Sequence, residues 1–156
     1  TRTVSSAASD VYKRQVLMTG NSKQVDLEKY AVFVDGVTSN PSKDYKSFLD
    51  SIEYLDGEGS NIQRLLTAAV GISAEGGEFM EIVKKMVFQG KPWNDDNREH
   101  LIIELGDVMW YVMQACAALD VSLEDVVAGN VEKLKKRYPG GEFNVYESEN
   151  RAADDR

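Results

Sequence analysis

The chain has few of the residues that form disulfides or imidazole-bound metal sites. Its 156 residues include one cysteine, Cys116, and one histidine, His100. A lone cysteine cannot close an intramolecular disulfide, so we expect a protein of a reducing compartment, the cytoplasm of a bacterial or phage-infected cell. Cys116 lies in an apolar stretch and is expected to be an inert buried thiol. His100 lies outside every metal-ligand spacing and is expected to be structural.

Positive charge is also scarce. Lysine and arginine together number 18 against 26 acidic residues, which gives a net charge of −8. Without a basic stripe the chain cannot replace the counterions of a polymer, so binding to polymeric nucleic acid is not expected. Small nucleotides remain compatible with the charge, because a bound metal ion supplies local positive charge.

One apolar run, residues 101–119, is long enough to raise the question of a membrane span. Glu104, Asp107 and Gln114 interrupt it and no basic flank follows, so we do not expect a membrane segment. A helix that is apolar all round must instead be buried on every side. We therefore expect one face to lie in the chain's own bundle and another in a partner subunit, which makes the protein a homo-oligomer.

The first residues lack both an apolar segment and a helical or strand period. Residues 5–15 can be encoded by a transposase-based sequencing-library adapter read in frame. We expect residues 1–17 to be such an artefact or a disordered tail, with Met18 as the true start. The remaining length and composition predict one domain over residues 18–146, followed by a polar tail over 147–156.

Apolar residues recur at helical spacing from residue 25 onward, which predicts an all-α fold. Helices are expected over 25–37, 60–88, 96–119 and from 122 to just before Pro139, forming a four-helix bundle. Residues 43–55 carry a weaker pattern and are expected to be a short helix or an ordered loop. Capping-box patterns suggest the helix starts, and Gly90 suggests a C-terminal cap. The boxes are Ser60-x-x-Gln63, Asp96-x-x-Glu99 and Ser122-x-x-Asp125.

Two pairs of carboxylates have the spacing of one metal site. Glu75 and Glu78 lie three residues apart in one predicted helix, and Glu104 and Asp107 lie three apart in the next. Residues at this spacing share a helix face, and the intervening Gly90-Lys91-Pro92 break lets the two helices run antiparallel. Four ionised carboxylates in an apolar groove require a counter-charge. Mg²⁺, or Mn²⁺ in its place, accepts such oxygen ligands together with water and substrate phosphates.

These residues and their surroundings resemble a known family, the MazG-like all-α nucleoside triphosphate pyrophosphohydrolases, and the phage-type single-domain members in particular. The resemblance covers roughly residues 27–150. It is carried by Gly71-Ile72-Ser73-Ala74-Glu75-Gly76-Gly77-Glu78-Phe79-Met80-Glu81-Ile82-Val83-Lys84-Lys85, Glu104-Leu105-Gly106-Asp107, Asn130-Val131-Glu132-Lys133-Leu134 and Arg137-Tyr138-Pro139. Ala74 departs from the pattern, because many members have a further Glu there. The resemblance implies hydrolysis of a nucleoside triphosphate to its monophosphate and pyrophosphate, and assembly as a homodimer or a dimer of dimers.

Further candidates surround the carboxylates. Glu81 is interpreted as a third ligand, a supporting group or a general base, with a solvated surface as the plain alternative. Substrate phosphates are expected to meet cations, although lysines on a helix are most often solvated. The substrate-binding candidates are Lys84, Lys85, Asn130, Lys133, Arg137 and Tyr138, the last as a surface on which a base stacks.

Three other functions stay open. A di-iron carboxylate bundle would need Glu-x-x-His motifs, and Asn97 stands three residues before the single His100. A base-specific enzyme acting on dUTP, dCTP or phosphoribosyl-ATP would use the same architecture, with selectivity set by pocket shape. A non-catalytic helical interaction module would leave the carboxylates exposed among apolar neighbours, which is unfavourable.

Overall fold

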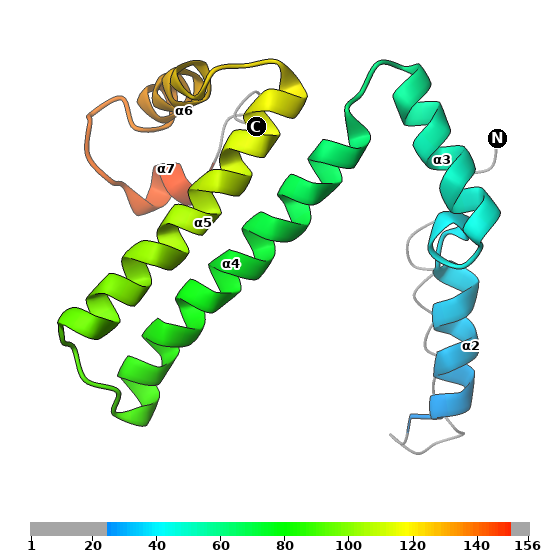
Figure 1. Ribbon diagram of the computed structural model, residues 1–156, viewed down its shortest axis with the longest axis horizontal. Coiled ribbons are helices and arrows are strands. Elements are labelled where there is room, and N and C mark those ends of the chain that lie inside the picture. Colours follow the sequence, from blue (N-terminus) through cyan, green and yellow to red (C-terminus); the bar gives the residue numbers. More distant parts are fainter. Residues whose placement is uncertain (1–24, 151–156) are drawn as a thin grey trace. The chain divides into compact units, whose positions relative to one another are not determined.

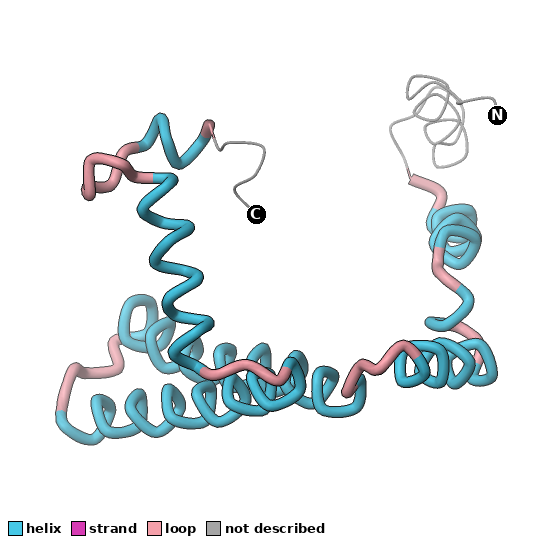
Figure 2. Tube along the Cα trace, turned by 90° about the horizontal axis from the view of Figure 1, so that it is seen from above, coloured by secondary structure: helices cyan, strands magenta, loops and turns pink. Residues whose placement is uncertain are grey.

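The computed structural model describes residues 25–150, and the predicted adapter segment therefore lies outside the described residues. Every regular element there is helical, as expected (Figure 2). The elements are α2 (Leu27–Val37), the 3₁₀ helix η1 (Asn40–Ser42), α3 (Tyr45–Gly57), α4 (Ile62–Gln89), α5 (Asp95–Leu119), α6 (Leu123–Arg137) and α7 (Val145–Glu149). The chain divides into two compact units, Thr1–Tyr54 and Leu55–Arg156. The prediction of one domain over 18–146, with a tail after it, stays a prediction.

In the first unit, α2 follows the predicted range closely. Asp26 caps it, accepting a hydrogen bond from the Lys29 amide at 3.1 Å. The weak pattern over 43–55 forms a true helix, α3, and Asp44, which precedes it, accepts from the Ser47 amide at 2.7 Å. Neither α2 nor α3 contains a buried residue, so apolar side chains on both helices are left uncovered by the other described residues.

In the second unit, α4 and α5 run antiparallel as a long hairpin (Figure 1). Gly90 ends α4 in the left-handed conformation, at φ 71°, as the sequence predicted. Two predicted caps were wrong by one or two residues, because asparagines take the role. Asn61 caps α4 and Asn94 caps α5, each accepting from the amide three residues on, at 3.3 and 2.9 Å.

The seam of the hairpin is narrow at Gly71. A Cβ at this position would collide with the ring of Tyr111 on α5, so glycine is required for the two helices to lie this close. Among described residues the buried hydrophobic side chains are Ala68, Ile82 and Cys116. Burial of the Cys116 thiol agrees with the expected inert role. A core this small leaves much of the apolar surface of α4 and α5 uncovered.

Helix α5 is long and apolar enough to cross a membrane by length and composition alone, although such a helix is also common in protein cores. It carries acidic Glu104 and Asp107 near its middle and packs against α4. Among its exposed apolar residues are Ile102, Ile103, Leu105, Met109, Trp110 and Met113.

Helix α6 lies against α5 and begins at the predicted cap (Figure 1). Ser122 accepts from the Asp125 amide at 3.0 Å, and its hydroxyl donates to the Asp125 carboxylate at 2.7 Å. Helix α7 was not predicted. The described residues thus form six α-helices, and the strongest packing among them is the α4–α5 hairpin, whereas the sequence predicted four helices in one bundle.

Candidate metal and phosphate site

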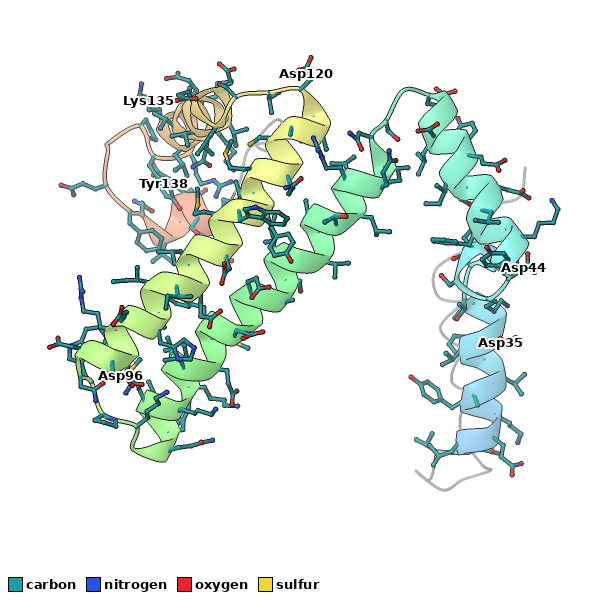
Figure 3. The ribbon with its side chains drawn as sticks, viewed as in Figure 1. Asp35, Asp44, Asp96, Asp120, Lys135 and Tyr138 are labelled. Carbon is teal, nitrogen blue, oxygen red and sulfur yellow. The ribbon has the colours of Figure 1, made fainter. Side chains whose placement is uncertain are left out.

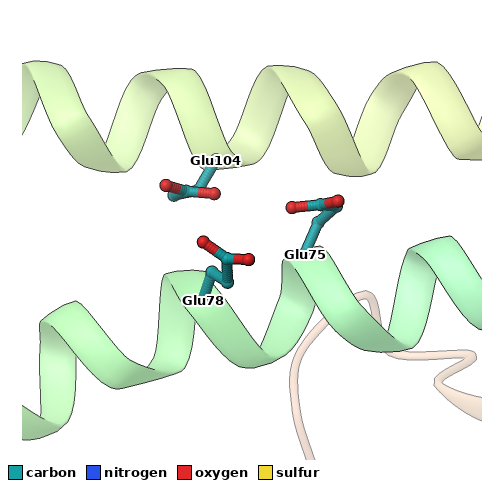
Figure 4. A group of neighbouring side chains, drawn as sticks. All are labelled: Glu75, Glu78 and Glu104. Carbon is teal, nitrogen blue, oxygen red and sulfur yellow. The ribbon is translucent and has the colours of Figure 1, made fainter.

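Three of the four predicted carboxylates converge between the hairpin helices. Glu75 and Glu78 point from α4 toward α5, and Glu104 points back from α5 (Figure 4). Their nearest oxygens all lie within 4.8 Å of one another. The spacing of three residues places the α4 pair on one face, and the antiparallel register of α5 brings Glu104 opposite that face.

Asp107, the fourth predicted ligand, is exposed and is not part of this closest group. It is nevertheless near enough for its charge to act on Glu75. Partial desolvation raises the pKa of the Glu75 carboxyl, and the negative charges of Glu78, Asp107 and Glu104 raise it further. The four groups therefore form one electrostatic cluster whose negative charge is not fully compensated.

Glu104 is buried, with 6% of its surface exposed. Its Oε1 lies 3.0 Å from Nε2 of His100, one helical turn earlier on α5. This contact was not predicted, although the spacing of four residues was a usable signal, since such pairs meet on a helix. His100 thus belongs to the edge of the site, where it holds one oxygen of the buried carboxylate.

A depression of about 280 Å³ opens beside the cluster. It is lined by Ala74, Gly77, Glu78, Glu81, Ile82, Lys85, Lys91, His100 and Glu104. Glu81 forms ion pairs with Lys84 and with Lys85, the latter at 3.3 Å, and these lysines lower the pKa of its carboxyl. Glu81 therefore lines the depression and is already paired with two cations, and its predicted role in catalysis stays a prediction.

The predicted substrate-binding residues in and just after α6 do not line the depression. These residues are Asn130, Lys133, Arg137 and Tyr138. The Tyr138 ring lies 6.0 Å from that of Phe143, centroid to centroid, beyond the end of α6 (Figure 3). Their predicted role in substrate binding stays a prediction.

The donor set suits a hard divalent cation. All ligand atoms in the converging group are carboxylate oxygens, which Mg²⁺ and Mn²⁺ accept and soft metals do not prefer. Desolvation raises the pKa of the Glu75 carboxyl and the neighbouring negative charges raise it further, so a bound cation would stabilise the ionised cluster. Glu75, Glu78 and Glu104, with Asp107 beside them, are the residues that would hold such an ion.

An all-α chain with a carboxylate cluster between two antiparallel helices, open to a depression that also holds lysines, belongs to the class of helical proteins suited to metal-assisted phosphate chemistry. Comparison with known proteins makes the assignment specific. Residues 63–141 match the MazG nucleotide pyrophosphohydrolase domain. The chain belongs to this family.

A relative supports the assignment. The "Gene 37 protein" of Mycobacterium phage L5 is 39% identical over 87 residues, a match that covers 54% of this chain and 75% of the relative. No solved structure matches the chain significantly. The predicted phage-type MazG resemblance is thereby confirmed, and the matched domain contains both carboxylate pairs.

Proposed function

We propose that this protein hydrolyses nucleoside or deoxynucleoside triphosphates to the monophosphate and pyrophosphate, with Mg²⁺ as the cofactor. The observation that carries the proposal is the convergence of Glu75, Glu78 and Glu104 within a matched MazG domain. When bound, Mg²⁺ supplies positive charge that offsets the phosphate charge and lowers the pKa of a bound water.

Direct attack by water is favoured over a covalent intermediate. The residues lining the depression include no serine, threonine or cysteine, and the single thiol, Cys116, is buried away from them. A group on the protein must then accept the proton of the attacking water.

Glu78 is the carboxylate best placed for that role. It lines the depression, is exposed, and forms no hydrogen bond or ion pair within residues 25–150. Glu104, by contrast, has one oxygen held by His100. Glu78 is also one of the residues that would hold the metal ion, so we assign proton acceptance to the one of its two carboxylate oxygens that is not a ligand, and the fixing of the cluster geometry to Glu104.

The test is a screen of the common ribonucleoside and deoxynucleoside triphosphates for pyrophosphate release, with Mg²⁺, Mn²⁺ or EDTA present. We expect metal-dependent release of pyrophosphate with a stoichiometric monophosphate. Release of orthophosphate and a diphosphate instead would contradict the assigned bond cleavage. Turnover of a single substrate would favour the base-specific alternative, and absence of turnover with every substrate would favour the non-catalytic module.

We also propose that two copies of the chain associate through α5. The support is the small core of Ala68, Ile82 and Cys116, together with the exposed apolar side chains of α5. Among the described residues few apolar side chains are fully buried, and burial of more apolar surface would stabilise the fold. Association with a second copy would cover the apolar face of α5 that α4 leaves open.

A further inference from the structure

The depression beside the carboxylates is lined by lysines as well as by acidic residues. Two lysines line it: Lys85 lies near the C-terminal end of α4, and Lys91 lies in the connection to α5. Lys85 stands seven residues after Glu78, about 10 Å farther along the helix axis. The negative groups and these two cations therefore follow one another along the hairpin, toward the α4–α5 turn.

The turn that carries Lys91 is fixed on both sides. Before it, Gly90 adopts the left-handed conformation, and the Lys91 amide donates to the Lys85 carbonyl at 3.1 Å. After it, the side chain of Asn97 donates from Nδ2 to the Pro92 carbonyl at 2.7 Å. Asn97 is only 3% exposed, so this bond is shielded from water. A turn held by these bonds keeps the base of the Lys91 side chain in a defined place at the edge of the depression.

The two lysines differ in their present partners. Lys85 is paired with Glu81, whereas Lys91 forms no ion pair within residues 25–150. Lys91 is also partly buried. A lysine without a counter-ion that lines a depression is complementary to an anionic ligand.

On these grounds we infer that Lys91, together with Lys85, forms a subsite for the pyrophosphate portion of the substrate. The inference rests on the proposed function and adds the direction in which the triphosphate lies in the depression. The terminal phosphates would lie toward the α4–α5 turn, and the nucleoside would extend toward the opposite end of the hairpin. Lys91 would then bind the β and γ phosphates, which carry most of the negative charge of the triphosphate.

The experiment measures the affinity of inorganic pyrophosphate, both as an inhibitor of turnover and by calorimetry in the presence of Mg²⁺. Lys91→Met removes the charge and keeps most of the length of the side chain, whereas Lys91→Arg keeps the charge. Lys46→Met is the matched control, because Lys46 is an exposed lysine of α3 that pairs with Asp50 at 2.9 Å. The monophosphate product is measured in parallel on each protein.

We expect Lys91→Met to weaken pyrophosphate binding about tenfold or more, the effect of losing one charge-assisted hydrogen bond. The KM for the triphosphate should rise with it, while monophosphate binding stays within about twofold. Lys91→Arg should restore most of the affinity, and Lys46→Met should behave as the unmodified protein.

Unchanged pyrophosphate affinity in Lys91→Met, in a protein that hydrolyses triphosphates, would overturn the subsite and leave the proposed function standing. Equal weakening of pyrophosphate and monophosphate would overturn the orientation. If the unmodified protein turned over no triphosphate yet bound pyrophosphate through Lys91, the subsite would stand and the proposed activity would fall. Absence of both turnover and pyrophosphate binding would overturn both.

Discussion

Among the carboxylates of the site, Glu78 and Glu104 differ in what holds them. Glu104 is buried and contacts His100, whereas Glu78 is exposed and has no hydrogen-bond partner within the described residues. This difference separates a residue that fixes geometry from one whose carboxylate is open to a ligand. The sequence predicted both carboxylates as ligands but offered no means of distinguishing them, because each belongs to an acidic pair with the same i, i+3 spacing.

Glu78→Gln is expected to lower kcat by about 10²-fold or more, because general-base catalysis contributes on this scale. Helicity should be unchanged, since the substitution keeps the size of the side chain. Asp107→Asn should also reduce turnover, through weaker metal binding. Circular dichroism measures helicity, metal titration measures the affinity for Mg²⁺, and steady-state kinetics measures kcat. Full activity of both variants with Mg²⁺ would refute the site.

Glu75 provides a test that links stability to metal binding. Its carboxyl has a raised pKa, so folding favours the protonated form. A carboxyl of this kind destabilises the folded state above its folded pKa, and the penalty is relieved as the pH falls through that pKa. Glu75→Gln removes the charge and should therefore raise the melting temperature at neutral pH in EDTA.

The same substitution should weaken Mg²⁺ binding, so that added Mg²⁺ stabilises Glu75→Gln less than the unmodified protein. Binding of Mg²⁺ to the unmodified protein should also weaken as the pH is lowered, because protons compete for Glu75. Thermal melts across pH, with and without Mg²⁺, measure both effects. A lower melting temperature for Glu75→Gln in EDTA would show that the charge repulsion is not the governing effect.

At the scale of the elements, the helix ranges were predicted well and the caps less well. Ser60 looks like an N-cap in sequence, yet its hydroxyl donates to the Leu55 carbonyl at 2.7 Å and so serves the end of α3. Asn61 then caps α4. Two adjacent residues with capping side chains were available, and the position at which the preceding helix ends decided between them.

The close contact between α4 and α5 at Gly71 can be tested by substitution. Gly71→Ala places a methyl group against the Tyr111 ring, which must shift, so we expect a loss of about 1–3 kcal/mol in the free energy of unfolding. Gly129→Ala is the matched control, because Gly129 lies within α6 with open space around it. There the gain in helix propensity should stabilise the protein by up to about 1 kcal/mol. Chemical denaturation measures both values, and equal changes in the two variants would argue against close packing at Gly71.

At the scale of the whole molecule, the proposed self-association uses the exposed side of α5. Met113→Arg should disrupt self-association and lower the melting temperature, because it places an unpaired charge in the expected interface. Glu142→Arg, at an exposed position outside the helices, should leave the association state unchanged. Sedimentation at micromolar concentration measures the state. A stable, active monomer of the unmodified protein would contradict the proposed association.

The sequence by itself determined the helical class, the order and approximate ranges of the helices, and the four carboxylates, because these depend on local periodicity and i, i+3 spacing. The tertiary structure decided which side chains from different helices lie close together, because local spacing cannot show this. The register of α5 against α4 brought Glu104 within reach of Glu75 and Glu78 and left Asp107 at the margin. It also placed Lys91 in the depression and His100 beside a buried carboxylate. Which groups share a site depends on how two helices pack, and here that packing rests on the absence of a side chain at Gly71.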